Sequence, residues 1–173
     1  GKKTIPRTVE IVDKSEPELT VNTITAVYDG NEITSDKIKG TAKYDDKEIK
    51  GTWSFKGTVP KNAADKKCTV VFTPTDEEIY KPAETEVDVD ISPRNLNDIV
   101  SLKDTEFTYN RNAQKAGVIA VFNGTTLAEG DDYETEFPQD ITNAGDKTVK
   151  IKGKGNFGGE KELKYTIKPK DIG

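Results

Sequence analysis

Runs in which apolar and polar residues alternate at a period of two constrain this fold more than any other feature. The clearest run is TEVDVDI at residues 85–91, where Val87, Val89 and Ile91 alternate with acidic side chains. This period places one face of a β-strand in a core and the other in water, whereas a helix needs an apolar repeat near 3.6 residues. CTVVFTP at residues 68–74 has the same period. The sequence therefore predicts an all-β chain.

Turn signals separate the alternating runs. Asn123-Gly124 is a strong hairpin signal, and Asp45-Asp46 marks a second turn. Pro93 stops the strand before it, because proline cannot donate to a β-ladder. No segment sustains the helical period, so helix is expected only as single turns, at residues 61–67 or 95–100.

The second half of the chain repeats the order of signals in the first. Pro17, Pro93 and Pro169 are separated by 76 residues each time, and Tyr109 lies 81 residues after Tyr28. Such ordered spacing is typical of repeat architectures. The predicted organisation has three parts: residues 1–17 as a leading strand or the end of a preceding repeat, residues 18–93 as a first module, and residues 94–173 as a second.

Composition excludes several kinds of chemistry. The chain has no histidine, which removes the Ser-His-Asp and Cys-His arrangements and an ordinary zinc site. Its only thiol, Cys68, lies in an apolar strand pattern without a visible base, which favours a buried, inert side chain. We therefore expect a protein that is not an enzyme and that has no cofactor and no metal.

Charge and hydropathy exclude further partners. The net charge of -5 comes from 26 basic and 31 acidic residues with no run of five like charges, so there is no basic stripe for nucleic acid. No window reaches the apolar length of a membrane helix. We expect no nucleic-acid partner and no membrane insertion by this segment. The start at Gly1 indicates a piece of a longer protein.

A glycine motif lies between two of the alternating runs. Gly153, Gly155 and Gly158 spell G-x-G-x-x-G. A dinucleotide-binding loop needs a helix after it, but EKELKYTI at residues 160–167 alternates as a strand. A kinase glycine loop lies between strands, but it needs a His-Arg-Asp loop, which a chain without histidine lacks. We interpret the glycines as shaping a turn.

Paired carboxylates are also interpreted as turn residues rather than as a catalytic site. They occur at residues 45–46, 76–78 and 131–132, and adjacent side chains on turns usually point apart into water. A calcium site built from such turns is an alternative left open, but the D-x-D-x-D-G spacing of a calcium loop is absent. A Lys-Asn isopeptide bond would need a lysine, an asparagine and a carboxylate buried together, and the abundance of lysine leaves that alternative open.

Aromatic residues leave two alternatives. They fill the cores of small sandwiches, or they form an exposed surface that stacks on a sugar or peptide. The candidates for such a ligand surface are Trp53, Tyr80, Tyr133 and Phe157.

The second half resembles a known family. FNGTTLAEGDDYETEF at residues 122–137 and NAGDKTVKIKGKGNFGGEKELKYTIKPK at 143–170 resemble the bacterial immunoglobulin-like repeats, of the MBG type, in large cell-surface proteins. Residues 19–93 resemble a looser relative through YDG, GTWSF and TVVFTPTD. Asn110-Arg111 and Phe157 depart from the usual residues of the family. The residues that mark the repeat are Tyr28, Tyr109, Asp132, Gly145, Gly153, Gly155 and Asn156.

The resemblance implies both a fold and a function. The implied fold is two tandem immunoglobulin-like β-sandwich domains in an elongated arrangement. The implied function is a non-catalytic structural spacer or stalk of a bacterial protein, extracellular at the cell surface or cell wall. The alternative is an adhesin module that binds a host glycan or protein. The expected partners are neighbouring repeats of the same chain or a host or bacterial surface ligand, and the chain itself is expected to be a monomer.

Overall fold

The chain is all-β, as the alternating runs predict. The computed structural model describes residues 13–173, so most of the predicted leading segment at 1–17 lies outside the described residues. The single helical turn of the described chain is the 3-10 helix η1 (Ser35–Lys37). The turns predicted at residues 61–67 and 95–100 are not helical, and that prediction was wrong. At the first of them the chain makes an isolated turn, in which Asp65 N–H donates to the Asn62 carbonyl at 3.0 Å and Asp65 Oδ2 accepts the N–H groups of Lys61 and Asn62.

The described chain forms two compact units, and each takes segments from several parts of the sequence. The first unit holds the described residues up to Ile24, Thr34–Val59 and Lys67–Asp88. The second unit holds Thr25–Ile33, Pro60–Lys66 and Val89–Gly173. The modules at residues 18–93 and 94–173 are predicted from sequence repeats, and the division into compact units does not test them. They stay a prediction.

A three-stranded antiparallel sheet belongs to the first unit. Its order is β1 (Glu18–Val21), β3 (Gly40–Tyr44), β4 (Lys47–Glu48). β3 and β4 are joined by Asp45 and Asp46, whose φ angles of 48° and 60° are those of a tight hairpin. The turn predicted there is confirmed.

A four-stranded sheet contains the strands with the clearest alternation. Its order is β2 (Ile24–Val27), β7 (Ala83–Ser92), β6 (Lys67–Pro74), β5 (Gly51–Lys56). The side chains that alternation placed in the core are all buried: Cys68, Val70, Phe72, Val87, Val89 and Ile91.

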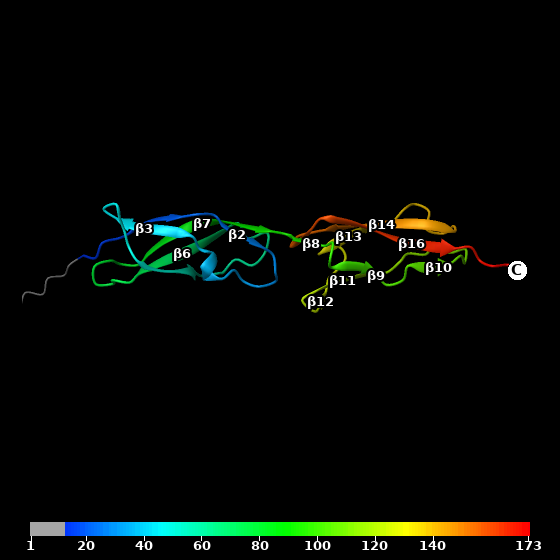
Figure 1. The fold of residues 1–173 in the computed structure, drawn as a ribbon, viewed down its shortest axis with the longest axis horizontal. Helices are drawn as coiled ribbons and strands as arrows, with labels where there is room; N and C mark the ends of the chain where they lie inside the picture. Colours follow the sequence, from blue (N-terminus) through cyan, green and yellow to red (C-terminus); the bar gives the residue numbers. More distant parts are fainter. Residues whose placement is uncertain (1–12) are drawn as a thin grey trace, which may run out of the picture. The chain divides into compact units, whose positions relative to one another are not determined.

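The second unit contains two further sheets and a short parallel pair (Figure 1). One sheet has the order β9 (Val100–Leu102), β11 (Val118–Phe122), β12 (Thr125–Thr126), with the predicted Asn123-Gly124 turn between β11 and β12. The other has the order β10 (Glu106–Thr108), β16 (Glu160–Lys168), β14 (Gly145–Gly153), β13 (Tyr133–Glu136). The parallel pair is β8 (Arg94–Asn95) with β15 (Phe157–Gly158).

Buried side chains form separate clusters in the two units. In the first unit, Ala42, Ile49 and Phe72 pack together, with half-buried Trp53 and Tyr80 against them. In the second, a larger cluster is built from Leu96, Val100, Ala120, Leu127, Tyr133, Val149, Ile151 and Phe157. A smaller cluster of Ala116, Tyr165 and Ile167 holds half-buried Tyr109.

Candidate functional site

The glycine motif lies in the connection between β14 and β16. Gly153 ends β14, Gly158 is the last residue of β15, and the next element is the strand β16. A nucleotide phosphate bound by this type of motif would need the free N–H groups of a helix that starts there. The prediction that a strand follows the motif is confirmed.

Backbone hydrogen bonds occupy several N–H groups of this turn. Three of them donate to carbonyl oxygens of neighbouring chain at 2.9–3.0 Å: Gly153 to Gly159, Lys154 to Asp132, and Phe157 to Lys154. An N–H group that donates to a carbonyl is not available to a phosphate. The turn is therefore held by its own backbone.

The four aromatic candidates lie in two separate clusters. Tyr133 and Phe157 are buried in the main cluster of the second unit, 6% and 3% exposed. Burial raises the pKa of the Tyr133 hydroxyl above its ordinary value, with smaller contributions from Glu129 and Asp132. Trp53 and Tyr80 are half-buried against Phe72 in the first unit. Tyr133 and Phe157 therefore offer no stacking surface.

The marker residues also have packing or backbone roles. Tyr28 meets Phe157 edge-on at 5.5 Å between ring centroids, and Asp132 Oδ2 accepts the N–H of Ala128 at 2.9 Å. Gly145 begins β14 with a φ of 137°, and Gly155 has a φ of 60°, conformations that favour glycine.

A cleft in the second unit is the strongest candidate for a binding site. Its volume is about 730 Å³. The residues that line it are Tyr109, Asn110, Arg111, Asn143, Ala144, Pro169, Lys170 and Ile172. Two of these carry positive charge, Arg111 and Lys170, and none is a carboxylate. Of the residues that mark the repeat, Tyr109 lines the cleft. The sequence alone does not group the lining residues, because they come from three segments far apart in the chain.

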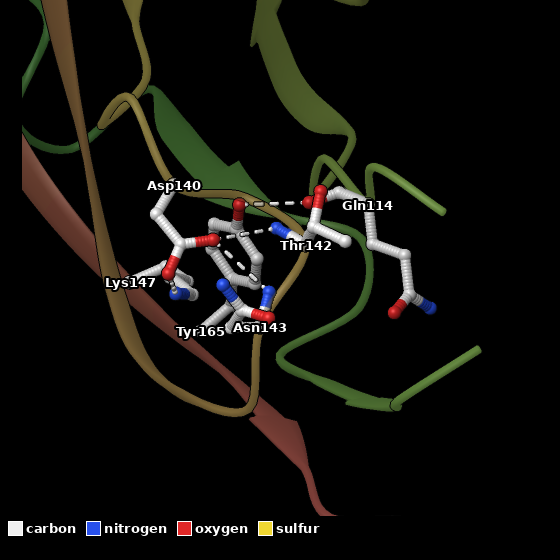
Figure 2. A network of polar contacts seen from close by, with 6 residues as sticks. All are labelled: Gln114, Asp140, Thr142, Asn143, Lys147 and Tyr165. Atoms are coloured by element: carbon white, nitrogen blue, oxygen red, sulfur yellow. Dashed lines mark hydrogen bonds and ion pairs between the residues drawn. The ribbon is translucent and has the colours of Figure 1, made fainter. Parts of the chain in front are cut away.

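A polar network adjoins the cleft through Asn143 (Figure 2). Asp140 Oδ1 accepts the N–H groups of Thr142 and Asn143 at 3.1 and 3.0 Å. Its other oxygen pairs with Lys147 Nζ at 3.2 Å, and the Lys147 side chain is only 7% exposed. Beside it, buried Tyr165 donates its hydroxyl to the Gln114 carbonyl at 2.9 Å.

This network brings a lysine, an asparagine and a carboxylate together. An isopeptide bond would need the carboxyl to act as a proton donor while the amine attacks the amide. Asp140 is instead half-exposed, and hydrogen bonds from the Asn143 and Thr142 N–H groups and from Lys147 hold its pKa well below its usual value. The carboxyl is therefore ionised, and the arrangement is an ion pair that neutralises a buried lysine.

Stability should depend on the charge of Asp140. Because the pKa of its carboxyl is lower in the folded chain than the ordinary 3.8, its stabilising effect is complete well above pH 3.8 and declines as the pH falls below it. Asp140→Asn should therefore melt below the wild type at pH 7, and the difference should narrow from pH 4 towards pH 2. The measurement is thermal unfolding across this range, with Asp104→Asn, an exposed carboxylate, as control. A difference that stays constant with pH would contradict the assignment.

The remaining candidates are a thiol and paired carboxylates, and burial or hydrogen bonds to backbone account for them. Cys68 is buried, and burial raises the pKa of its thiol, which opposes thiolate formation. Asp76 Oδ1 accepts the N–H groups of Glu78 and Ile79 at 3.2 and 3.3 Å. Within residues 13–173, no three histidine, cysteine, aspartate or glutamate side chains are grouped as metal ligands would be.

No protein-family model matches the chain, and no curated protein matches it. Within the described residues, no helix has the length and apolar character needed to cross a membrane.

Proposed function

We propose that residues 18–93 and 94–173 are two copies of one immunoglobulin-like β-sandwich module, and that the chain is a non-catalytic spacer of a bacterial cell-surface or secreted protein. The observation that carries the proposal is the correspondence of sheet order between the two halves. The bacterial surface location rests on the resemblance of the sequence alone.

Both kinds of sheet occur twice with the same strand order. Along the chain, β2, β5, β6 and β7 correspond to β10, β13, β14 and β16, and both sets are arranged in the same way. The three-stranded sheets β1-β3-β4 and β9-β11-β12 correspond likewise. Two unrelated segments would have little reason to share both orders, so the correspondence supports duplication of one module.

Individual contacts also correspond. Tyr28 N–H donates to the Ser92 carbonyl at 2.9 Å, and Tyr109 N–H donates to the Lys168 carbonyl at 2.8 Å. In each case the accepting residue precedes one of the prolines that are 76 residues apart, Pro93 and Pro169. This agreement in register supports the repeat unit inferred from the sequence.

The surroundings of the reactive groups support the proposed spacer role. The buried lysine is paired, the thiol is buried, and the glycine turn is held by its own backbone. Two sandwiches joined by the short Ser92-Pro93-Arg94 segment would form an elongated, monomeric rod at low concentration. Such a rod would hold other domains away from a surface.

Stretching single molecules tests whether two modules exist. Each module of about 76 residues should unfold in its own step and release about 250 Å of chain, since extended chain spans about 3.5 Å per residue. Two steps of similar length are expected. A single step that releases the whole chain would contradict two independent modules.

The adhesin alternative is favoured by one observation, the cleft at Tyr109. Its volume and its mixture of an aromatic with cationic and amide groups are those of a small-ligand site. Binding on a glycan and matrix-protein array that is lost in Arg111→Glu would support this alternative. A blank array would leave the spacer function alone.

A further inference from the structure

We propose that the cleft at Tyr109 docks a second copy of this chain, and that the aromatic pair Tyr44–Tyr80 of that copy enters it. This inference rests on the proposed repeat, because it compares corresponding surfaces of the two modules. The corresponding surface at Tyr28 is already covered by an aromatic pair, and this covered example lies within the second unit.

Tyr28 shows what an occupied surface looks like. Its ring packs against Phe122 at 6.0 Å and edge-on against Phe157 at 5.5 Å between centroids. Phe122 and Phe157 are themselves edge-on at 5.5 Å. Next to Tyr28, the Asp29 carbonyl accepts a hydrogen bond from Asn123 Nδ2 at 2.8 Å. Tyr28 and its neighbour therefore pack against an aromatic pair and a hairpin turn.

Amide hydrogen bonds complete the occupied surface. Asn156 Oδ1 accepts the N–H of Ala63 at 2.8 Å, and Asn156 Nδ2 donates to Asn62 Oδ1 at 3.0 Å. Ala63 is 9% exposed as a result of this cover. The loop at residues 62–63 and the Tyr28 loop are thus covered together.

The cleft at Tyr109 corresponds to the surface at Tyr28, but within the described residues no aromatic pair covers it. Tyr109, Asn143 and Ala144 lie 81 residues after Tyr28, Asn62 and Ala63, and all three line the cleft. Ala144 is exposed, whereas Ala63 is buried. The cleft is therefore the space that an aromatic pair fills at the first copy of this surface.

The chain carries a second aromatic pair that matches this space. Tyr44 and Tyr80 are edge-on at 5.9 Å between centroids, and they correspond to Phe122 and Phe157. Tyr44 precedes the Asp45-Asp46 turn as Phe122 precedes the Asn123-Gly124 turn. Tyr44 is 39% exposed, so within residues 13–173 the pair lacks the cover that Tyr28 gives to its counterpart.

Charge favours the same pairing. The cleft carries Arg111 and Lys170. The aromatic pair is flanked by acidic residues at 45–46 and 76–78, which outnumber the neighbouring Lys43, Lys47 and Lys81. Opposite charges on the two surfaces add attraction and orientation, and salt weakens that contribution.

The two docking surfaces differ from each other, so the contact is head-to-tail. Such contacts do not close a dimer and allow further copies to add. Within one chain, a short linker holds such surfaces at effective concentrations of about a millimolar. Because the copy of the surface at Tyr28 is docked at such an effective concentration, a comparable contact between separate chains should have a dissociation constant at or below about 1 mM.

Sedimentation velocity of the whole chain from about 10 µM to about 1 mM tests this, since that range brackets the concentration at which docking is expected. The wild type should sediment faster as its concentration rises. Tyr44→Ala and Tyr109→Ala should each lose the increase, and Arg111→Glu, an exposed change, should weaken association at least about tenfold. Ile119→Ala, exposed on β11, should behave as the wild type. Circular dichroism checks that each variant is folded.

Mixing the two tyrosine variants gives the decisive result. Tyr44→Ala retains its cleft and Tyr109→Ala retains its aromatic pair, so the mixture should form a 1:1 dimer and nothing longer. No association of the wild type at about 1 mM, or association retained in either single variant, would overturn the proposal. A ligand that binds in the cleft would be lost in Tyr109→Ala but kept in Tyr44→Ala. Failure here leaves the spacer function intact, because that function is tested on the monomer by stretching.

Discussion

Gly153→Ala is expected to destabilise the second unit by about 3 kcal/mol, because the added methyl group would collide with backbone. A Cβ at this position would lie 2.6 Å from the Gly158 nitrogen and 2.7 Å from the carbonyl carbon of Phe157. Gly153 is held in β14 by its pairing with Tyr133, and Phe157 and Gly158 are held in β15 by their pairing with β8, so neither side can move away alone.

Gly155→Ala is the matched variant in the same turn. Its Cβ would meet nothing closer than the Asp131 carbonyl at 3.9 Å, so only the φ of 60° opposes the substitution. That conformation costs an alanine about 1 kcal/mol. Urea unfolding of both variants gives the comparison. Equal losses, or a larger loss at Gly155, would refute the account of Gly153 as a close-approach residue.

Phe157→Ala should cost about 4 kcal/mol of unfolding free energy, as truncation of a buried aromatic usually does. Its ring is 3% exposed and is edge-on to both Tyr28 and Phe122, contacts that alanine removes. Urea unfolding of this variant measures the cost.

Ile119→Ala is the control for this loss. Ile119 lies on β11 in the same unit but is 44% exposed, so its truncation should cost less than about 1 kcal/mol. If Phe157→Ala were as stable as the wild type, the ring would not belong to the core, and the ligand-surface alternative for Phe157 would regain support.

Local pattern was enough to predict the strands and the tight turns. A strand such as β6 needs only its alternation and a core to face, and Asn123-Gly124 favours one type of hairpin wherever it occurs. The strand after Gly158 was predictable for the same reason. The helical turn expected at residues 61–67 is instead an isolated turn held by Asp65, and this geometry has no periodic signal in the sequence.

The candidate site depends on tertiary arrangement, which local pattern does not encode. Arg111, Asn143 and Lys170 line one cleft although each lies in a different polar stretch of the sequence. Likewise, the Lys147 position in an alternating strand predicts burial, but its pairing with Asp140 depends on how the preceding loop turns back. Tyr133 and Trp53 both lie in alternating strands, so alternation predicts the same burial for both. Only the packing shows that the Tyr133 ring is buried and the Trp53 ring is half-buried.

The proposal that the chain is two modules in series is tested most directly by X-ray scattering from the monomer at low concentration. A compact globule of 173 residues has a radius of gyration of about 16 Å. Two modules of about 80 residues, each with a radius of gyration of about 12 Å, exceed about 20 Å when they are arranged end to end. A value above about 20 Å is the predicted result, and a value near 16 Å would contradict the spacer function.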